Sequence, residues 1–152
     1  MHKTIVSDTS CFIVLDNIGE LEILKLSYGN ILTTQDVADE FGKGLPQWVE
    51  IKSPLDKQFQ KELELELGKG EASAIALAVE IKDCTVILDD LKARNIAEKL
   101  KLDITGTIGV IIKAKNKNII PSIKPYLQKL KNTDFRLSSI LEELALRESG
   151  EI

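Results

Sequence analysis

The stretch Thr4-Ile5-Val6-Ser7-Asp8 is a short, mostly apolar run that ends in an acidic residue. Its length and its β-branched residues predict a buried central strand. A second run of the same kind, Thr85-Val86-Ile87-Leu88, is followed directly by Asp89 and Asp90. Ligands of open parallel sheets bind at the carboxyl ends of the strands. The acidic residues after the two runs are therefore predicted to lie in one cleft.

Outward from these two runs, strand-like and helix-like stretches alternate along the chain, which favours an α/β fold with a parallel sheet covered by helices. The predicted strands are 4–7, 30–32, 48–51, 85–88 and 103–105. The predicted helices are 10–26 (continuous or broken at 17–19), 35–41, 56–67, 71–82, 91–100, 107–115, 122–131 and 139–148. The length of 152 residues predicts a single domain over 1–152, with C-terminal helices from about 122.

Glu71 is predicted to stand at the head of a buried helical stripe. At about 100° per residue, Glu71, Ile75 and Ala78 share one face, which should pack on the sheet. The alternative is a first-turn glutamate that is favoured only by the helix dipole. The alignment with apolar residues favours a functional carboxylate over the strand ends.

The helix before Phe41 supplies a further acidic candidate. Val37, Ala38 and Phe41 define its buried side, and Glu40 flanks that side more closely than its acidic neighbours. Asp36 and Asp39 are predicted to point outward. Thr34 is the predicted N-cap of this helix, with Gly42 beyond its end.

Acidic side chains brought together from distant segments repel one another, and the repulsion destabilises the fold unless a cation lies between them. A cluster made only of carboxylate oxygen suits hard ions such as Mg²⁺ or Mn²⁺. The acidic pattern therefore predicts metal-assisted phosphodiester chemistry.

The residue inventory excludes several other classes of site. His2 is the only histidine and lies at the N-terminus, which argues against Ser-His-Asp or Cys-His catalysis and against histidine-rich zinc sites. Cys11 and Cys84 are predicted to be buried, reduced thiols. No P-loop motif is present. The turn 106–109 is a candidate phosphate contact, although a helix start with Thr107 as its cap is the favoured interpretation.

Charge is distributed unevenly along the chain. Residues 1–90 carry 8 basic and 17 acidic side chains, residues 91–131 carry 10 and 2, and residues 132–152 carry 2 and 5. The central basic block is a candidate surface for a phosphate backbone, or equally a set of solvated helix faces. Few aromatic residues lie within the block, so a base-stacking platform is not indicated.

Hydropathy and the N-terminus bear on location. No apolar run approaches the length of about 20 residues that spans a bilayer, and the N-terminus has no signal-peptide pattern. A cytoplasmic protein without membrane association is therefore expected.

Four ordered segments together resemble the PIN-domain family. They are Ile5-Val6-Ser7-Asp8-Thr9-Ser10, Val37-Ala38-Asp39-Glu40, Gly70-Glu71-Ala72-Ser73-Ala74-Ile75-Ala76-Leu77-Ala78 and Val86-Ile87-Leu88-Asp89-Asp90 with Arg94. The segment from Thr105 through Lys115 resembles an uncharacterised bacterial and archaeal branch of that superfamily, related to VapC-type toxins.

The resemblance implies a three-layer α/β/α sandwich with a central parallel sheet. It also implies a Mg²⁺- or Mn²⁺-dependent endoribonuclease, usually dimeric and often inhibited by a cognate antitoxin. By position, the catalytic and metal-binding acids would be Asp8, Glu40, Glu71 and either Asp89 or Asp90. Two departures are visible: Glu71 stands where VapC toxins usually have Asp, and Leu88-Asp89-Asp90 replaces their usual Thr-x-Asp.

The leading hypothesis is a metal-dependent ribonuclease acting on RNA, possibly the toxin of a toxin–antitoxin pair. The hydroxyls of Ser7, Thr9 and Ser10 would orient water or phosphate, and Lys92 and Arg94 would hold the RNA backbone. The alternative is a catalytically inactive module of the same fold that binds RNA or an antitoxin. A phosphoacceptor receiver-like domain is disfavoured because its acidic pair follows the first strand, whereas here the pair comes late.

Overall fold

A five-stranded, all-parallel sheet forms the centre of the protein in a computed structural model that describes residues 3–152. The strands follow the spatial order β3-β2-β1-β4-β5. Their bounds are β1 Thr4–Ser7, β2 Ile31–Thr33, β3 Val49–Ile51, β4 Cys84–Ile87 and β5 Asp103–Thr105. The two apolar runs of the sequence lie side by side, with Ile5 opposite Thr85 and Ser7 opposite Ile87. The prediction that β1 is a central strand is confirmed.

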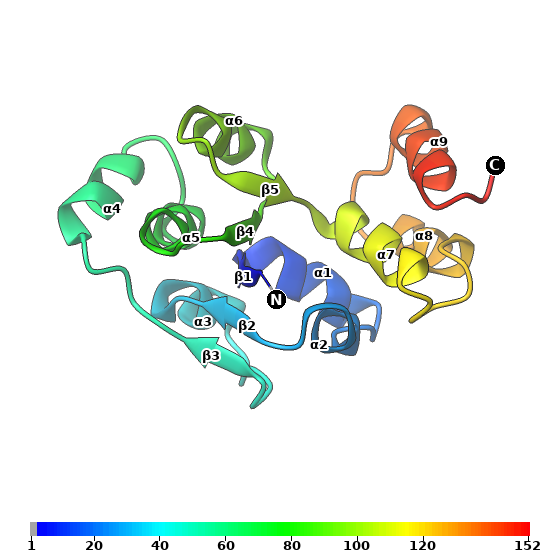
Figure 1. Ribbon diagram of the computed structural model, residues 1–152, viewed down its shortest axis with the longest axis horizontal. Coiled ribbons are helices and arrows are strands. Elements are labelled where there is room, and N and C mark those ends of the chain that lie inside the picture. The colour runs from blue at the N-terminus through cyan, green and yellow to red at the C-terminus, as the bar shows by residue number, and fades with distance from the viewer. Residues whose placement is uncertain (1–2) are drawn as a thin grey trace.

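Helices connect and cover these strands (Figure 1). Their bounds are α1 Thr9–Asn17, α2 Glu22–Tyr28, α3 Gln35–Phe41, α4 Lys57–Leu63, α5 Lys69–Glu80, α6 Leu91–Lys99, α7 Thr107–Asn116, α8 Lys124–Lys131 and α9 Ser139–Glu148. The first predicted helix is broken at the predicted point, so that α1 and α2 are separate. The predicted C-terminal helices are also present, as α8 and α9.

Side-chain alternation along the strands divides the core into two layers. Ile5 and Ile87 face a cluster that includes residues of α1, α2, α7 and α8. Val6 and Val86 face the opposite cluster, which includes residues of α4, α5 and α6. Figure 1 shows the sheet between these two groups of helices. The α/β class and the three-layer α/β/α arrangement are confirmed.

Helix α5 is buried almost all round, and this changes the argument about Glu71. Every residue from Ala72 to Ala78 is buried, because α5 packs against α3 and α4 as well as against strands of the sheet. Its alanines and Ser73 allow this close approach. The predicted stripe therefore does not distinguish one face from another. Glu71 is instead placed by its position in the first turn of α5.

Helix caps explain several boundaries. Thr34 accepts a hydrogen bond from the Val37 N–H at 3.1 Å, and Gly42 ends α3 with a left-handed φ of 74°, both as predicted. The Asp56 side chain caps α4 at Phe59, so the helix begins at Lys57 and ends at Leu63. The predicted helix over 56–67 was therefore too long.

The starts of α4 and α7 are decided by groups outside each helix. Leu55 precedes α4 and is 86% exposed. Its backbone N–H donates to the Glu80 carboxylate. Thr107 was predicted as the cap of α7, but Gly106 occupies the cap position and Thr107 is the first helical residue.

The structure also describes the state of the two thiols and the length of the helices. Cys11 and Cys84 are both buried and free, as predicted. None of the helices in residues 3–152 is both long and apolar enough to cross a lipid bilayer. His2 lies outside the described residues.

The strand order creates a switch point between β1 and β4. From β1 the chain proceeds to β2 and β3 on one side, and then to β4 and β5 on the other. The connections leave the carboxyl ends of β1 and β4 in opposite directions, which opens a crevice between them. Asp8 and Asp89 lie at this crevice, directly beyond β1 and β4.

Candidate active site

Asp8 is a fully buried carboxyl group at the end of β1. One oxygen accepts a hydrogen bond from the Cys11 N–H at 3.0 Å and so caps α1, and the other accepts from the Asp89 N–H at 3.3 Å. Burial, followed by the negative charge of Asp89, raises the pKa of Asp8 to about 8, against the opposing effect of the two N–H donors. Asp8 therefore caps α1. Because its pKa lies near neutral pH, its carboxyl group can also exchange a proton for a cation.

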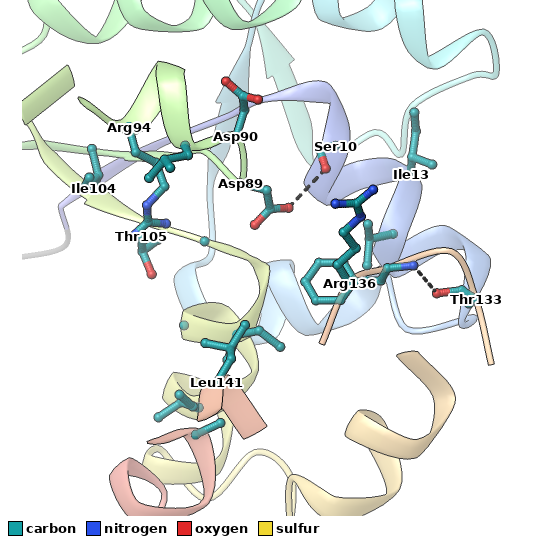
Figure 2. Close-up of a pocket in the computed structure, with 18 of the residues that line it drawn as sticks. Ser10, Ile13, Asp89, Asp90, Arg94, Ile104, Thr105, Thr133, Arg136 and Leu141 are labelled. Carbon is teal, nitrogen blue, oxygen red and sulfur yellow. Dashed lines mark hydrogen bonds between the residues drawn. The ribbon is translucent and has the colours of Figure 1, made fainter. Parts of the chain in front are cut away.

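Asp89 is oriented by three hydrogen bonds. One oxygen accepts from the Thr107 N–H at 2.7 Å, and the other accepts from the Thr107 hydroxyl at 2.6 Å and the Ser10 hydroxyl at 3.1 Å. Figure 2 shows the Ser10 contact at the wall of the cavity. The residue interpreted as a helix cap, Thr107, is thus a partner of the acidic site. Its position at the start of a helix after a parallel strand was the available signal.

Glu71 and Asp90 form the outer part of the acidic cluster. The pKa of Glu71 is raised by partial burial and next by the charge of Asp90, with a smaller effect from Glu40. Asp90 is exposed and caps α6 by accepting from the Ala93 N–H at 3.0 Å. Asp89 thus faces Asp8, whereas Asp90 faces Glu71, and both of the alternative acids lie at the site.

Glu40 reaches the cluster across Gly70. A Cβ atom at Gly70 would lie 2.6 Å from the Thr9 hydroxyl and 2.7 Å from a Glu40 carboxylate oxygen. The Thr9 hydroxyl is buried and has no hydrogen-bond partner among the described residues. Glycine at position 70 therefore allows the oxygen atoms of Thr9 and Glu40 to approach the backbone of α5 closely.

Asp36 and Asp39 of α3 were both predicted to point outward, and this is confirmed for Asp39 only. Asp39 is exposed and accepts from the Gln35 side chain. Asp36 does not point freely outward: it is half-buried and accepts from the Gln60 amide at 2.7 Å. The packing of α4 on the outer side of α3 and α5 explains this difference.

The predicted substrate-binding residues are placed differently from one another. Ser10 and Arg94 line the large cavity beside the acidic residues, and Arg94 also donates to the Leu88 carbonyl at 2.9 Å. Ser7 is fully buried and donates to the Asp8 carbonyl. Lys92 is exposed on α6 and does not line this cavity. Only part of the predicted phosphate-binding set thus faces the site.

A cavity of about 1010 Å³ opens beside Glu71, Asp89 and Asp90 and extends to the segment between α8 and α9. Arg136, from that segment, projects into the cavity on the side where Ser10 and Asp89 lie (Figure 2). Within residues 3–152 it pairs with no carboxylate. Sequence reasoning missed Arg136 because it belongs to the acidic C-terminal stretch, outside the basic block.

The donor chemistry of the cluster fits a hard divalent cation. The candidate donors are carboxylate oxygens, and the unpartnered Thr9 hydroxyl adds another oxygen. In the described part of the chain, no three acidic, histidine or cysteine side chains are already grouped as a metal site. Mg²⁺ commonly keeps several waters and uses only one or two carboxylates. A site of that kind would need only one or two of Asp8, Glu40, Glu71, Asp89 and Asp90.

Comparison with known proteins gives a family for this chain. No curated protein and no solved structure matches it. The family model DUF3368, described as a PIN domain, matches residues 4–151, which include all five strands and every acidic residue of the site. The chain therefore belongs to this PIN-domain family.

Proposed function

We propose that this protein is a Mg²⁺- or Mn²⁺-dependent endoribonuclease that hydrolyses RNA phosphodiester bonds at the crevice between β1 and β4. Membership of a PIN-domain family indicates a nuclease-type function. The observation that carries the finer proposal is the gathering of acids from four distant segments around the carboxyl ends of β1 and β4. Burial is the main cause of the raised pKa of both Asp8 and Glu71; the charges of Asp89 and Glu71 add to it at Asp8, and those of Asp90 and Glu40 add to it at Glu71.

The proposed roles of the carboxylates follow from their environments. Asp8 and Asp89, which are held rigidly by backbone and hydroxyl donors, would form the fixed part of the metal site. Glu71 and Asp90, closer to solvent, would adjust to the ion and its waters. The chemistry that such an ion supplies when bound is a lower pKa for water and neutralisation of charge on the phosphate.

Substrate would approach through the cavity that contains Arg136. A guanidinium suits phosphate because it offers several donors in a planar fork. Arg94 is partly engaged by the Leu88 carbonyl, which leaves Arg136 as the freer cation. Ser10, which donates to Asp89, could turn its hydroxyl toward a phosphate oxygen. The substrate-positioning roles of Ser7, Thr9 and Lys92 stay predictions.

The alternative proposal is an inactive module that binds RNA or an antitoxin. It is favoured by one observation: both oxygens of Asp89 already accept hydrogen bonds. Metal binding at Asp89 would have to add to these contacts or displace one of them. A toxin–antitoxin role, a homodimer and a cytoplasmic location likewise stay predictions.

The test is the metal affinity and RNA cleavage rate of Glu71→Gln, which keeps the shape of the side chain and removes its charge. We expect Mn²⁺ affinity measured by calorimetry to fall by about tenfold or more and cleavage to fall by about 100-fold. Asp39→Asn is the matched control, because it removes one acidic charge from an exposed position of the neighbouring helix. It should change neither quantity by more than about twofold.

Two results would separate the proposals. Mn²⁺ affinity and cleavage that are both unchanged in Glu71→Gln would remove Glu71 from the site. RNA binding by the wild type without any metal-dependent cleavage would favour the inactive module.

A further inference from the structure

The amino ends of β1 and β2 border two adjoining cavities of about 290 and 690 Å³, of which the smaller extends to Thr105 at the end of β5. The smaller contains Lys113, and the two cavities share Lys3, Tyr28 and Lys117. These residues come from the start of β1, the end of α2 and the end of α7. Figure 1 shows α2 and α7 on the same side of the sheet, and the two helices are in contact.

Positive charge is concentrated at this edge. The ammonium groups of Lys113 and Lys117 lie 5.4 and 5.6 Å from the centroid of one ring, that of Tyr28. The two lysines are four residues apart at the end of α7, and like charges at that spacing on a helix repel each other. No carboxylate lines the smaller cavity, and neither lysine forms an ion pair within residues 3–152. An anion bound between them would remove the repulsion.

The other contacts of these lysines leave N–H donors available for an anion. Lys117 donates to the Ser27 carbonyl, which uses one of its three N–H donors. Lys3 is paired with Asp103 and is therefore the least free of the three. Burial raises the pKa of Tyr28 to about 12, so its phenol stays neutral and retains a donor. The edge can thus offer several N–H and O–H donors to one anion.

An aromatic and amide wall adjoins the positive charge. The larger cavity is also lined by half-buried Trp48, by Asn30 and by Gln47. Ser27, which is 2% exposed, lines it too, and its hydroxyl has no hydrogen-bond partner in the described residues. Glu50 is its one acidic lining residue. Aromatic faces stack on nucleobases, and amides hydrogen-bond their edges.

We propose that this edge is a second binding site, one that takes a nucleotide unit. Lys113 and Lys117 would hold its phosphate, and Trp48 would contact its base. Inorganic phosphate alone would meet only the lysines, and an uncharged nucleoside only the aromatic wall. The ligand is either a free nucleotide or one unit of an RNA strand. Thr105 and Gly109 line both the smaller cavity and the acidic-site cavity, so the two sites adjoin at the start of α7.

The sole tryptophan, Trp48, gives a local readout. The full chain would be titrated, in EDTA so that no metal-dependent cleavage occurs, with AMP, inorganic phosphate or an eight-nucleotide single-stranded RNA. We expect a saturable change in Trp48 fluorescence that inorganic phosphate antagonises. The Lys113→Gln and Lys117→Gln double variant should weaken binding by at least about tenfold, since each lost charge-assisted bond is worth a factor of that order.

The control is Lys57→Gln with Lys61→Gln, which removes the same charge from two exposed positions of α4 that are also four residues apart. Both double variants would first be shown to melt cooperatively near the wild-type temperature. Lys113- and Lys117-dependent binding of AMP supports a free nucleotide, and the same dependence seen with RNA alone supports a strand. No fluorescence change with any ligand, or equal weakening in the control, would overturn the site. Neither result depends on whether the protein cleaves RNA.

Discussion

The two ends of the same short strands carry opposite chemistry. At the carboxyl ends of β1 and β4, Asp8 and Asp89 are held together by backbone and hydroxyl donors in a buried crevice. At the amino ends, Lys113 and Lys117 approach one tyrosine ring near the surface. The overall charge of -4 describes neither end.

The two ends also differ in how their charges are held. At the acidic site, Asp8 is buried and Asp89 is held by several hydrogen bonds, so removing either carboxylate should alter stability, pH dependence and chemistry together. The lysine site is formed by long, flexible side chains at the surface, so removing charge should alter ligand binding and little else. The acidic charges are thus integrated into the packing of the fold, whereas the lysine charges lie on its surface.

The largest expected effect is that of Asp8→Asn, which should reduce RNA cleavage by at least about 100-fold. It should also change the pH dependence of stability. The folded pKa of about 8 lies above the ordinary value of 3.8. Between these values the folded protein holds a proton that the unfolded chain releases, so this carboxyl's contribution to stability falls as pH rises. Without metal, wild-type melting temperature should therefore drop relative to Asp8→Asn from pH 5 to 9.

Asparagine keeps a carbonyl oxygen for the Cys11 N–H, and it is a favoured N-cap, but it cannot offer a second acceptor to the Asp89 N–H. The variant should therefore equal or exceed the wild type in stability only toward pH 9. If Asp8→Asn is less stable at every pH and binds Mn²⁺ normally, Asp8 is a structural cap alone.

An intermediate effect is expected for Gly70→Ala. Its Cβ atom would lie 2.6 Å from the buried Thr9 hydroxyl and 2.7 Å from Glu40. Glu40 can turn away, but Thr9 is fixed in the first turn of α1, so we expect a loss of about 1–3 kcal/mol in the free energy of unfolding. Cleavage should fall as Glu40 leaves the site. Denaturant unfolding and RNA cleavage would measure the two effects.

Gly44→Ala is the control, because its Cβ atom would meet nothing within 4 Å. Equal effects from the two alanine substitutions would show that the close approach of Thr9 and Glu40 to Gly70 has no special role.

The smallest expected effect is that of Arg136→Gln, which should raise the KM for RNA by about tenfold or less and leave kcat less affected. It should also reduce the salt dependence of binding, since one phosphate contact is lost. Arg147→Gln removes the same charge from α9, where Arg147 pairs with Glu143 at 2.9 Å, and should leave both quantities unchanged. A salt dependence that is identical in the two variants would remove Arg136 from the substrate path.

The strands were predictable because each is a short run of β-branched and apolar residues between polar breaks, as in Thr4–Ser7 and Cys84–Ile87. Helix starts were predictable where a side chain acts locally, as Thr34 does. Helix starts were predicted wrongly where a residue distant in the sequence holds the first turn or the segment before it. Asp89 engages Thr107 from 18 residues away, and Glu80 holds the backbone before α4.

Local sequence was enough to place the strand ends, and with them the approach of Asp8 to Asp89, because the carboxyl ends of parallel strands lie at one edge of the sheet. Which further groups meet at that edge depends on how the helices pack. Helical phase could not place Glu71 on a fully packed α5, and Arg136 enters from the acidic tail. The basic block lacks aromatic residues of its own, yet Tyr28 and Trp48 adjoin its lysines at the opposite edge. Proximity between residues far apart in the chain is set by packing, which local pattern does not encode.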